Sequence, residues 1–267
     1  MSLTVEGILG PEGLVARGLN GYERRDEQIE MARAVAAAFE DREHLIVEAG
    51  TGVGKSFAYL VPAILRAAES EERVVVSTNT IALQEQLIHK DLPFLQEALP
   101  LEFSATLAKG RNNYICFRRL ETAVKSARKL FESPEQVDEL QRIAEWAMET
   151  EAGSRQDIDF DVTPSVWDKV RCESGMCRGA QCRCYGRCHF MAARQRVQAA
   201  RIVVANHALF FADLALRSVE AQLLGAYDLV VLDEAHTIED VAAAHFGASV
   251  SSSSVRFLLR ELYNDRT

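Results

Sequence analysis

Residues 44–56 read His-Leu-Ile-Val-Glu-Ala-Gly-Thr-Gly-Val-Gly-Lys-Ser, and this stretch decides the fold class. The apolar residues 45–47 predict a short buried strand, the glycines predict a turn, and Lys55 and Ser56 begin a helical pattern. A strand, a glycine-rich turn and a helix in this order are typical of a phosphate-binding loop, in which successive backbone N–H groups surround a phosphate. We therefore predict that this stretch binds a nucleotide.

Two side chains of the loop have predicted chemical roles. Lys55 would reach the β- and γ-phosphates, and the hydroxyl of Ser56 would bind Mg²⁺. Ala49 occupies the position where the usual pattern has glycine, and the part that surrounds the phosphate is intact. The predicted nucleotide-binding residues of the loop are Ala49, Gly50, Thr51, Gly52, Val53, Gly54, Lys55 and Ser56.

A second motif, Leu-Val-Val-Leu-Asp-Glu-Ala-His, occupies residues 229–236 and predicts a buried strand that ends in two acids. At the end of such a strand Asp233 would hold Mg²⁺ and Glu234 would orient and activate the attacking water. An Asp-Glu pair after a strand is a weak signal alone, because acids also cap helices. Together with the loop it predicts ATP hydrolysis, with Lys55, Asp233 and Glu234 as the catalytic residues.

Further strands are expected at residues 73–77, 103–108, 201–205 and 228–233. Their alternation with helical segments predicts an α/β fold with a parallel, doubly wound sheet. A polar, helical stretch interrupts this alternation. We therefore predict an ATP-binding domain formed by residues 1–109 and 199–247, with a helical domain inserted at residues 110–198.

Charge is distributed unevenly along the chain, whose net charge is −9. Residues 107–129 hold seven basic residues against one acid, and residues 165–201 hold eight against two, so each segment has a net charge of +6. These segments predict a local anion-binding surface, and solvated helix faces are the alternative. The sequence shows neither a membrane-length apolar run nor a signal-peptide pattern, so we expect a cytoplasmic protein without membrane attachment.

The six cysteines are concentrated, because five of them lie within the seventeen residues 172–188. In a cytoplasmic protein such a cluster predicts metal or cofactor binding rather than disulfides. Cys177, Cys182 and Cys188 are separated by four and five residues, and Cys116 lies 61 residues before Cys177. This spacing favours an iron–sulfur cluster over zinc, although zinc stays open. The remaining cysteines, Cys172 and Cys184, are bystanders or alternative ligands.

Taken together, these motifs resemble the XPD/DinG family of iron–sulfur helicases in helicase superfamily two, and the bacterial DinG branch most closely. The likeness covers nearly the whole chain in the family's order. It rests on Tyr22-Glu23-x-Arg25-x-x-Gln28, the loop with its Ala49, Ser-Thr-Asn-Thr at 77–80, Leu-Gln-Glu-Gln-Leu at 83–87, Lys-Gly-Arg-Asn-Asn-Tyr-Ile-Cys at 109–116, Val-Val-Ala-Asn-His-Ala-Leu-Phe at 203–210 and Asp-Glu-Ala-His at 233–236.

The resemblance implies roles that the residues alone do not give. Gln28 would read adenine, residues 77–87 would contact DNA, and residues 248–267 would begin an arch-like insertion. A [4Fe–4S] cluster would be held by Cys116, Cys177, Cys182 and Cys188. The implied activity is ATP-dependent 5′-to-3′ movement on single-stranded DNA in repair or replication. The implied partners are single-stranded DNA or a forked duplex, and single-stranded-DNA-binding protein or other repair and replication factors.

One departure from the family is large, because only 31 residues follow His236. The family continues there with the arch and a second motor domain, so we expect a fragment or a truncated gene product. This chain alone should bind ATP weakly and show little or no hydrolysis or unwinding. Two alternatives stay open: a non-catalytic ATP-binding, DNA-binding or redox-sensing module, and a fragment of a zinc-bearing RNA helicase.

Four side chains beside the motifs have competing interpretations. Asn206 and His207 follow a predicted strand, so they would either face the site or cap the next helix. Tyr114 and Phe117 flank Cys116 and could stack on bases, but packing within the inserted region is the preferred interpretation.

Overall fold

The protein is described by a computed structural model that covers residues 3–19, 22–131 and 133–246, together with Ser252, Val255 and Leu259. The arch-like start expected at residues 248–267 therefore lies almost wholly outside the described residues. In the part that the structure covers, no helix is both long enough and apolar enough to cross a lipid bilayer.

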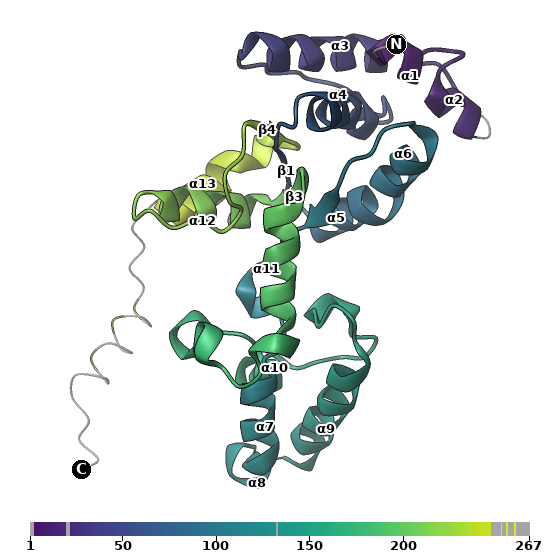
Figure 1. The fold of residues 1–267 in the computed structure, drawn as a ribbon. Coiled ribbons are helices and arrows are strands. Elements are labelled where there is room, and N and C mark those ends of the chain that lie inside the picture. The colour runs from purple at the N-terminus through teal and green to yellow at the C-terminus, as the bar shows by residue number, and fades with distance from the viewer. Residues whose placement is uncertain are drawn as a thin grey trace.

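A parallel four-stranded sheet lies at the centre of the ATP-binding part, with the strand order β2-β3-β1-β4 (Figure 1). Its strands are β1 (Val74–Thr78), β2 (Ala105–Leu107), β3 (Ile202–Asn206) and β4 (Leu229–Leu232). Val75 of β1 lies opposite Val203 of β3 on one side and Val230 of β4 on the other. The predicted α/β fold with a parallel sheet is confirmed, and each of these four strands had been predicted to within about two residues.

Helices cover both faces of the sheet because successive side chains of a strand point to opposite faces. Val74 and Val76 pack into one core with α1 to α4, η1 and α6, whereas Val75 packs into a second core with Phe210 and Phe211 of α12. The first group is α1 (Val5–Leu9), α2 (Leu14–Gly18), α3 (Asp26–Asp41), α4 (Lys55–Glu69), the π-helical turn η1 (Leu87–Asp91) and α6 (Leu92–Ala98), and α5 (Ile81–Gln86) directly precedes η1. The second is α12 (His207–Arg217) and α13 (Ile238–Phe246).

The strand predicted at residues 45–47 is wrong. This segment belongs to no strand, and its side chains are exposed, Ile46 to 97%. A buried strand needs a hydrogen-bonded neighbour, and β1 already pairs with β3 and β4 on its two sides. Only the outer edges of β2 and β4 are left, and among the described residues this segment pairs with neither.

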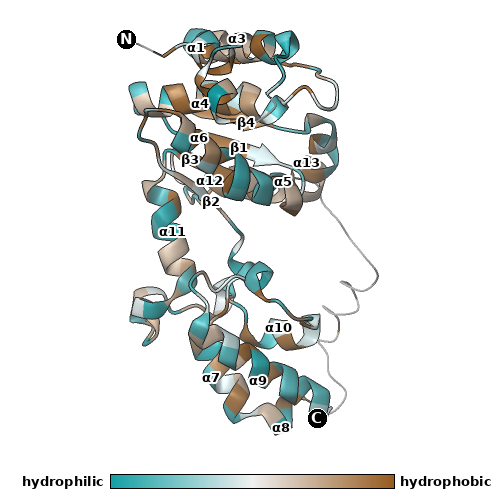
Figure 2. Cartoon of the chain, turned by 90° about the vertical axis from the view of Figure 1, so that its right-hand side faces the viewer, coloured by the Kyte–Doolittle hydropathy of each residue, from teal (hydrophilic) through white to brown (hydrophobic). Residues whose placement is uncertain are grey.

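The polar stretch between β2 and β3 folds around a hydrophobic core of its own, formed by Leu120, Leu140, Ile143, Trp167 and their neighbours. Figure 2 shows this helical group apart from the sheet, with α11 running between the two. Tyr114 and Phe117 are buried in this region, which confirms that they pack there. Its helices are α7 (Phe117–Lys125), α8 (Ala127–Leu130), α9 (Pro134–Glu149), α10 (Pro164–Val170) and α11 (His189–Ala199).

Short 3₁₀ turns connect these helices. They are η2 (Arg111–Asn113), η3 (Arg155–Asp157), η4 (Ser174–Met176), η5 (Gly179–Gln181) and η6 (Tyr185–Arg187), and η7 (Ala235–Thr237) follows β4. Two isolated antiparallel bridges, Tyr114 with Ser154 and Ile115 with Arg171, join the entry of the inserted region to its later segments.

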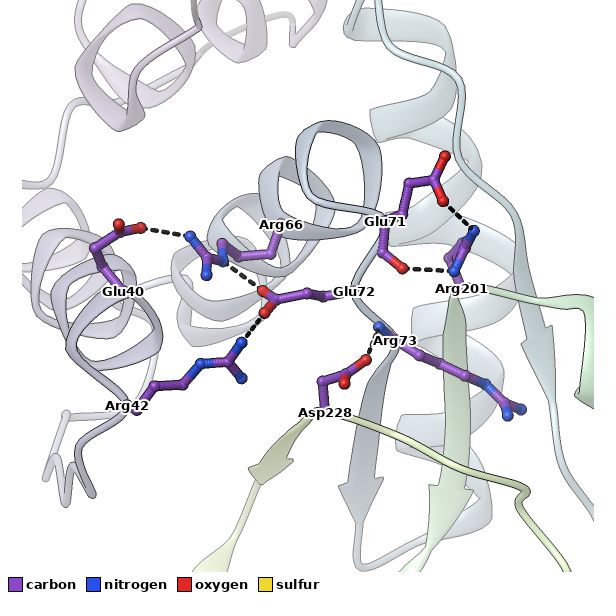
Figure 3. A network of polar contacts seen from close by, with 8 residues as sticks. All are labelled: Glu40, Arg42, Arg66, Glu71, Glu72, Arg73, Arg201 and Asp228. Carbon is purple, nitrogen blue, oxygen red and sulfur yellow. Dashed lines mark hydrogen bonds and ion pairs between the residues drawn. The ribbon is translucent and has the colours of Figure 1, made fainter.

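A network of ion pairs ties α3 and α4 to the start of β1 (Figure 3). The carboxylate of Glu72, which is 9% exposed, accepts a hydrogen bond from Arg66 Nε of α4 at 2.6 Å and pairs with Arg42 at the end of α3. Arg66 also pairs with Glu40 of α3. These contacts fix the end of α4, and therefore the loop at its other end, relative to the start of β1.

Glu71 and Glu72 offer a matched test of this network, because both carboxylates pair with arginine and differ in burial. Glu71, whose side chain is 82% exposed, pairs with Arg201 at 3.2 Å. We expect Glu72→Gln to lower the free energy of unfolding by about 1–2 kcal/mol, since a charged hydrogen-bond acceptor is lost from a largely buried site. Glu71→Gln should change it by less than about 0.5 kcal/mol. Urea denaturation measures both, and equal effects would contradict the role assigned to Glu72.

Candidate functional site

The loop requires glycine at the residue just before α4, Gly54. Gly52 and Gly54 have φ angles of 83° and 85°, a region that side chains with a Cβ rarely adopt. A Cβ on Gly54 would also lie 2.1 Å from Nε2 of Gln28. The chain therefore turns into α4 with Lys55 and Ser56 in its first turn, as the sequence predicts, although no strand precedes the loop.

Two side chains near the start of α3 donate hydrogen bonds to the backbone of the loop. Gln28 is 4% exposed, and its Nε2 donates a hydrogen bond to the carbonyl oxygen of Gly54 at 2.9 Å. Arg25 donates to the carbonyl oxygen of Gly52. The structure thus brings Gln28 to the loop, where it fixes the backbone, and its role in reading adenine stays a prediction.

The three predicted catalytic side chains meet beside the carboxyl ends of β1 and β4. Lys55 Nζ lies 3.3 Å from Oε1 of Glu234. The Oδ2 atom of Asp233 accepts from the hydroxyl of Tyr59 at 3.3 Å and from that of Thr78 at 3.4 Å. In open α/β sheets ligands bind at this end of the strands.

The environment of Asp233 fits a cation. Burial raises the pKa of its carboxyl group, and the negative charge of Glu234 raises it further. A positive charge placed between Asp233 and Ser56 would offset both effects. Carboxylate and hydroxyl oxygens are the ligands that Mg²⁺ prefers, so these residues fit the ion that the fold implies.

Asn206 and His207 turn out to have different roles. Asn206 caps α12, because its Oδ1 accepts a hydrogen bond from the N–H of Leu209 at 2.8 Å. His207 is 1% exposed, and its Nδ1 lies 2.7 Å from the hydroxyl of Ser77 on β1. The histidine therefore packs against the strand whose next residue, Thr78, contacts Asp233.

Tyr59 is a site residue that the sequence did not single out. It lies one helical turn after Lys55, so the spacing of four residues places it on the same face of α4. Its ring is 2% exposed and its hydroxyl reaches Asp233. The spacing could have suggested it, but the apolar helix around it favoured an interpretation as core.

All six cysteines line one cavity of about 30 Å³ in the inserted region. Cys116 and Cys188 immediately precede α7 and α11. The pKa of each of these two thiols falls to about 6, first because Cys172 hydrogen-bonds to it and also because the backbone N–H groups of the following helix do so. The structure thus places Cys172, which the sequence set aside, between Cys116 and Cys188.

The predicted ligand set is only partly assembled. Cys177 is exposed, and its sulfur accepts a hydrogen bond from its own turn, at 3.4 Å from the N–H of Gly179. Across the described ranges, no group of three or more His, Cys, Asp or Glu side chains is arranged to hold a metal ion. Six thiols around one cavity nonetheless supply the donor chemistry that an iron–sulfur cluster needs.

A larger cavity of about 510 Å³ lies where the inserted region meets the ATP-binding part. Its lining includes Lys109, Arg111, Arg194 and Asn206, with the rings of Tyr114 and Phe190. The guanidinium of Arg111 stacks on Phe190 at 4.2 Å, and its Nη1 atom is buried without a hydrogen-bond partner. Burial also lowers the pKa of Lys109. These cationic groups line a space that an anion could enter.

Comparison with known proteins identifies the class of protein to which the chain belongs. A family model described as DEAD/DEAH box helicase matches residues 29–152, and a second, described as DEAD_2, matches residues 176–255. The chain is therefore built from DEAD/DEAH helicase domains, in agreement with its loop and its Asp-Glu-Ala-His motif.

Curated relatives then specify the family. The chain is 35% identical to the ATP-dependent DNA helicase YoaA of Escherichia coli over 94% of its own length, and 37% identical to the ATP-dependent helicase DinG of Mycobacterium tuberculosis over 98%. It covers 39% and 41% of these proteins, so it spans about two fifths of their length. The chain belongs to the DinG-like helicases and corresponds to their N-terminal half, which confirms the resemblance seen in the motifs.

Proposed function

We propose that this chain supplies the ATP-binding part of a DNA helicase that couples ATP hydrolysis to 5′-to-3′ movement on single-stranded DNA. The observation that carries the proposal is the meeting of Lys55, Asp233 and Glu234 beside the carboxyl end of β1. The segment resembling a DNA-contacting motif begins at that same end, at Ser77. The ATP site and the proposed DNA-contacting segment would therefore meet at the carboxyl end of β1.

Each residue of the site has a chemical task in this proposal. Lys55 exchanges its contact with Glu234 for the β- and γ-phosphates, which frees the Glu234 carboxylate to orient a water molecule. Ser56 and Asp233 would hold Mg²⁺, which would supply positive charge against the phosphates. Tyr59 and Thr78 keep the Asp233 carboxylate turned toward the loop.

The cavity at the base of the inserted region is the proposed contact for single-stranded DNA. Lys109, Arg111 and Arg194 line it and supply positive charge for phosphates. The relatives' printed names describe helicases that act on DNA, which favours DNA over the RNA alternative. A forked duplex would place the strand junction beside the inserted region.

For the inserted region we propose a [4Fe–4S] cluster bound by Cys116, Cys177, Cys182 and Cys188. The shared cavity supports this set chemically. Binding would require Cys177 to leave its hydrogen bond with Gly179 and turn inward. The cluster would then join the starts of α7 and α11 to the turns η4 and η5, which Cys177 and Cys182 directly follow.

The remaining parts of the proposal concern the whole protein. Because the chain spans about two fifths of its relatives, unwinding would depend on regions that these relatives have in addition. We propose a cytoplasmic role in DNA repair or replication, alongside single-stranded-DNA-binding protein or other factors of these processes. By itself the chain should bind ATP weakly and hydrolyse little or none.

Arg111 provides the test of the DNA contact. We expect Arg111→Ala to weaken binding to a fluorescent single-stranded oligonucleotide about 3- to 10-fold. The slope of the logarithm of the binding constant against the logarithm of the salt concentration should become shallower by about one, since one phosphate contact is lost. Fluorescence anisotropy at several salt concentrations measures both quantities.

Arg142 is the matched control, because its guanidinium also stacks on a phenylalanine, Phe160 at 4.0 Å, and it does not line the cavity. Arg142→Ala should leave DNA affinity within about twofold. If both variants lose DNA affinity equally, or if neither loses any, the cavity is not the contact for single-stranded DNA.

The cluster has a separate test in the iron content and visible absorption of anaerobically purified protein. Cys116→Ser should abolish both, because a ligand is lost, whereas Cys184→Ser should retain them. The reverse pattern would show that the ligand choice is wrong. Colourless wild-type protein loaded with zinc would refute the cluster itself.

A further inference from the structure

His207 is a buried histidine that the two nucleotide motifs do not explain. It is the first residue of α12 and is 1% exposed, and its Nδ1 atom lies 2.7 Å from the hydroxyl oxygen of Ser77 on β1. Its other ring nitrogen, Nε2, is buried without a hydrogen-bond partner among the described residues. A buried polar atom without a partner costs stability, so packing alone does not account for a histidine at this position.

The hydrogen-bond partner of His207 connects directly to the nucleotide site. Ser77 begins the segment that resembles a DNA-contacting motif, but it is 0% exposed, so its side chain is out of reach of DNA. Its carbonyl oxygen accepts a hydrogen bond from the N–H of Asp233 at 2.8 Å. The next residue, Thr78, donates from its hydroxyl to the Asp233 carboxylate at 3.4 Å. Ser77 therefore lies between His207 and the carboxylate proposed to hold Mg²⁺.

The helix that begins at His207 also reaches the cavity proposed to contact single-stranded DNA. Ala208 and Ala212, which are four residues apart and so on one face of α12, line this cavity of about 510 Å³. Phe211 packs instead into the second core beside the sheet, and the same spacing places His207 on its face of the helix. The first turn of α12 thus has one face on the cavity and another against β1.

We propose that His207 is a positioning residue that couples the cavity to the ATP site. When DNA enters the cavity and moves the first turn of α12, the hydrogen bond between His207 and Ser77 transmits that movement to the end of β1 and so to Asp233. The inference rests on the proposed function, because it states how the two sites of that function influence each other. His207 itself does not line the cavity.

The sheet provides a second route between the same two sites. Asn206, which lines the cavity, pairs with Thr78 in the register of β3 and β1. This pairing belongs to the backbone and persists when a side chain is replaced, whereas the bond between His207 and Ser77 is lost. Substitutions at these two residues therefore distinguish the side-chain route from the backbone route.

The test measures the affinity of the full chain for a fluorescent ATP analogue with Mg²⁺, without and with a saturating single-stranded oligonucleotide. For the wild type we expect the oligonucleotide to change this affinity about fivefold or more, a usual size for coupling between two sites. In His207→Leu the change should fall to about twofold or less, since leucine is apolar and cannot bond to Ser77. His207→Asn, whose amide can still bond to Ser77, should retain more of the coupling.

Ser77→Ala tests the same hydrogen bond from its other end. It should reduce the coupling as His207→Leu does, and the double variant should lose no more than either one, since both substitutions remove a single bond. Phe211→Leu is the matched control, because this buried residue lies on the same face of α12 and has no polar atom. It should keep the wild-type coupling. Thermal unfolding checks that every variant folds.

The outcomes separate this inference from the proposed function. If the wild type binds both ligands without coupling, or if His207→Leu and Ser77→Ala keep the wild-type coupling, His207 is not a positioning residue, although the proposed function stands. If Phe211→Leu loses as much coupling as His207→Leu, the effect comes from the packing of α12, and the inference is again wrong. If the wild type binds neither the ATP analogue nor the oligonucleotide, the proposed function and the inference both fail.

Discussion

The ion pair between Lys55 and Glu234 joins segments 179 residues apart, and the rest of the site depends on it. One partner begins the helix after the phosphate loop, and the other follows β4. They meet because α4 shares one core with β1, β3 and β4, with Tyr59 and Thr78 completing the contact through Asp233. In the proposed function, phosphate would have to displace Glu234 from its contact with Lys55.

Contacts at the opposite end of the strands stabilise the position of α4 and so of this site. There Glu72 ties the ends of α3 and α4 to the start of β1 through Arg42 and Arg66. Gln28, near the start of α3, supports the loop through its contact with Gly54. The two ends of α3 therefore stabilise different parts of one unit: its start fixes the loop, and its end fixes the position of the sheet. The inserted region has a separate hydrophobic core.

The local motifs were readable from the sequence because their spacing encodes their chemistry. Glycines at 52 and 54 predict the turn, and the apolar runs at β1, β3 and β4 predict buried strands. Residues 45–47 have the same apolar character and form no strand, because pairing depends on which sheet edges are free, and that is a property of the whole fold. Cys172 was missed for a related reason. Its neighbour Cys116 is distant in sequence, and no local pattern records such a contact.

The central claim is that one connected site, formed by the loop and the end of β4, responds to nucleotide as a unit. Hydrogen–deuterium exchange with mass spectrometry, with and without a non-hydrolysable ATP analogue and Mg²⁺, tests it most directly. We predict slower exchange in the loop at residues 50–58 and at residues 232–236, with little change in α7 to α10. Protection confined to the loop, or absent from both segments, would contradict the claim.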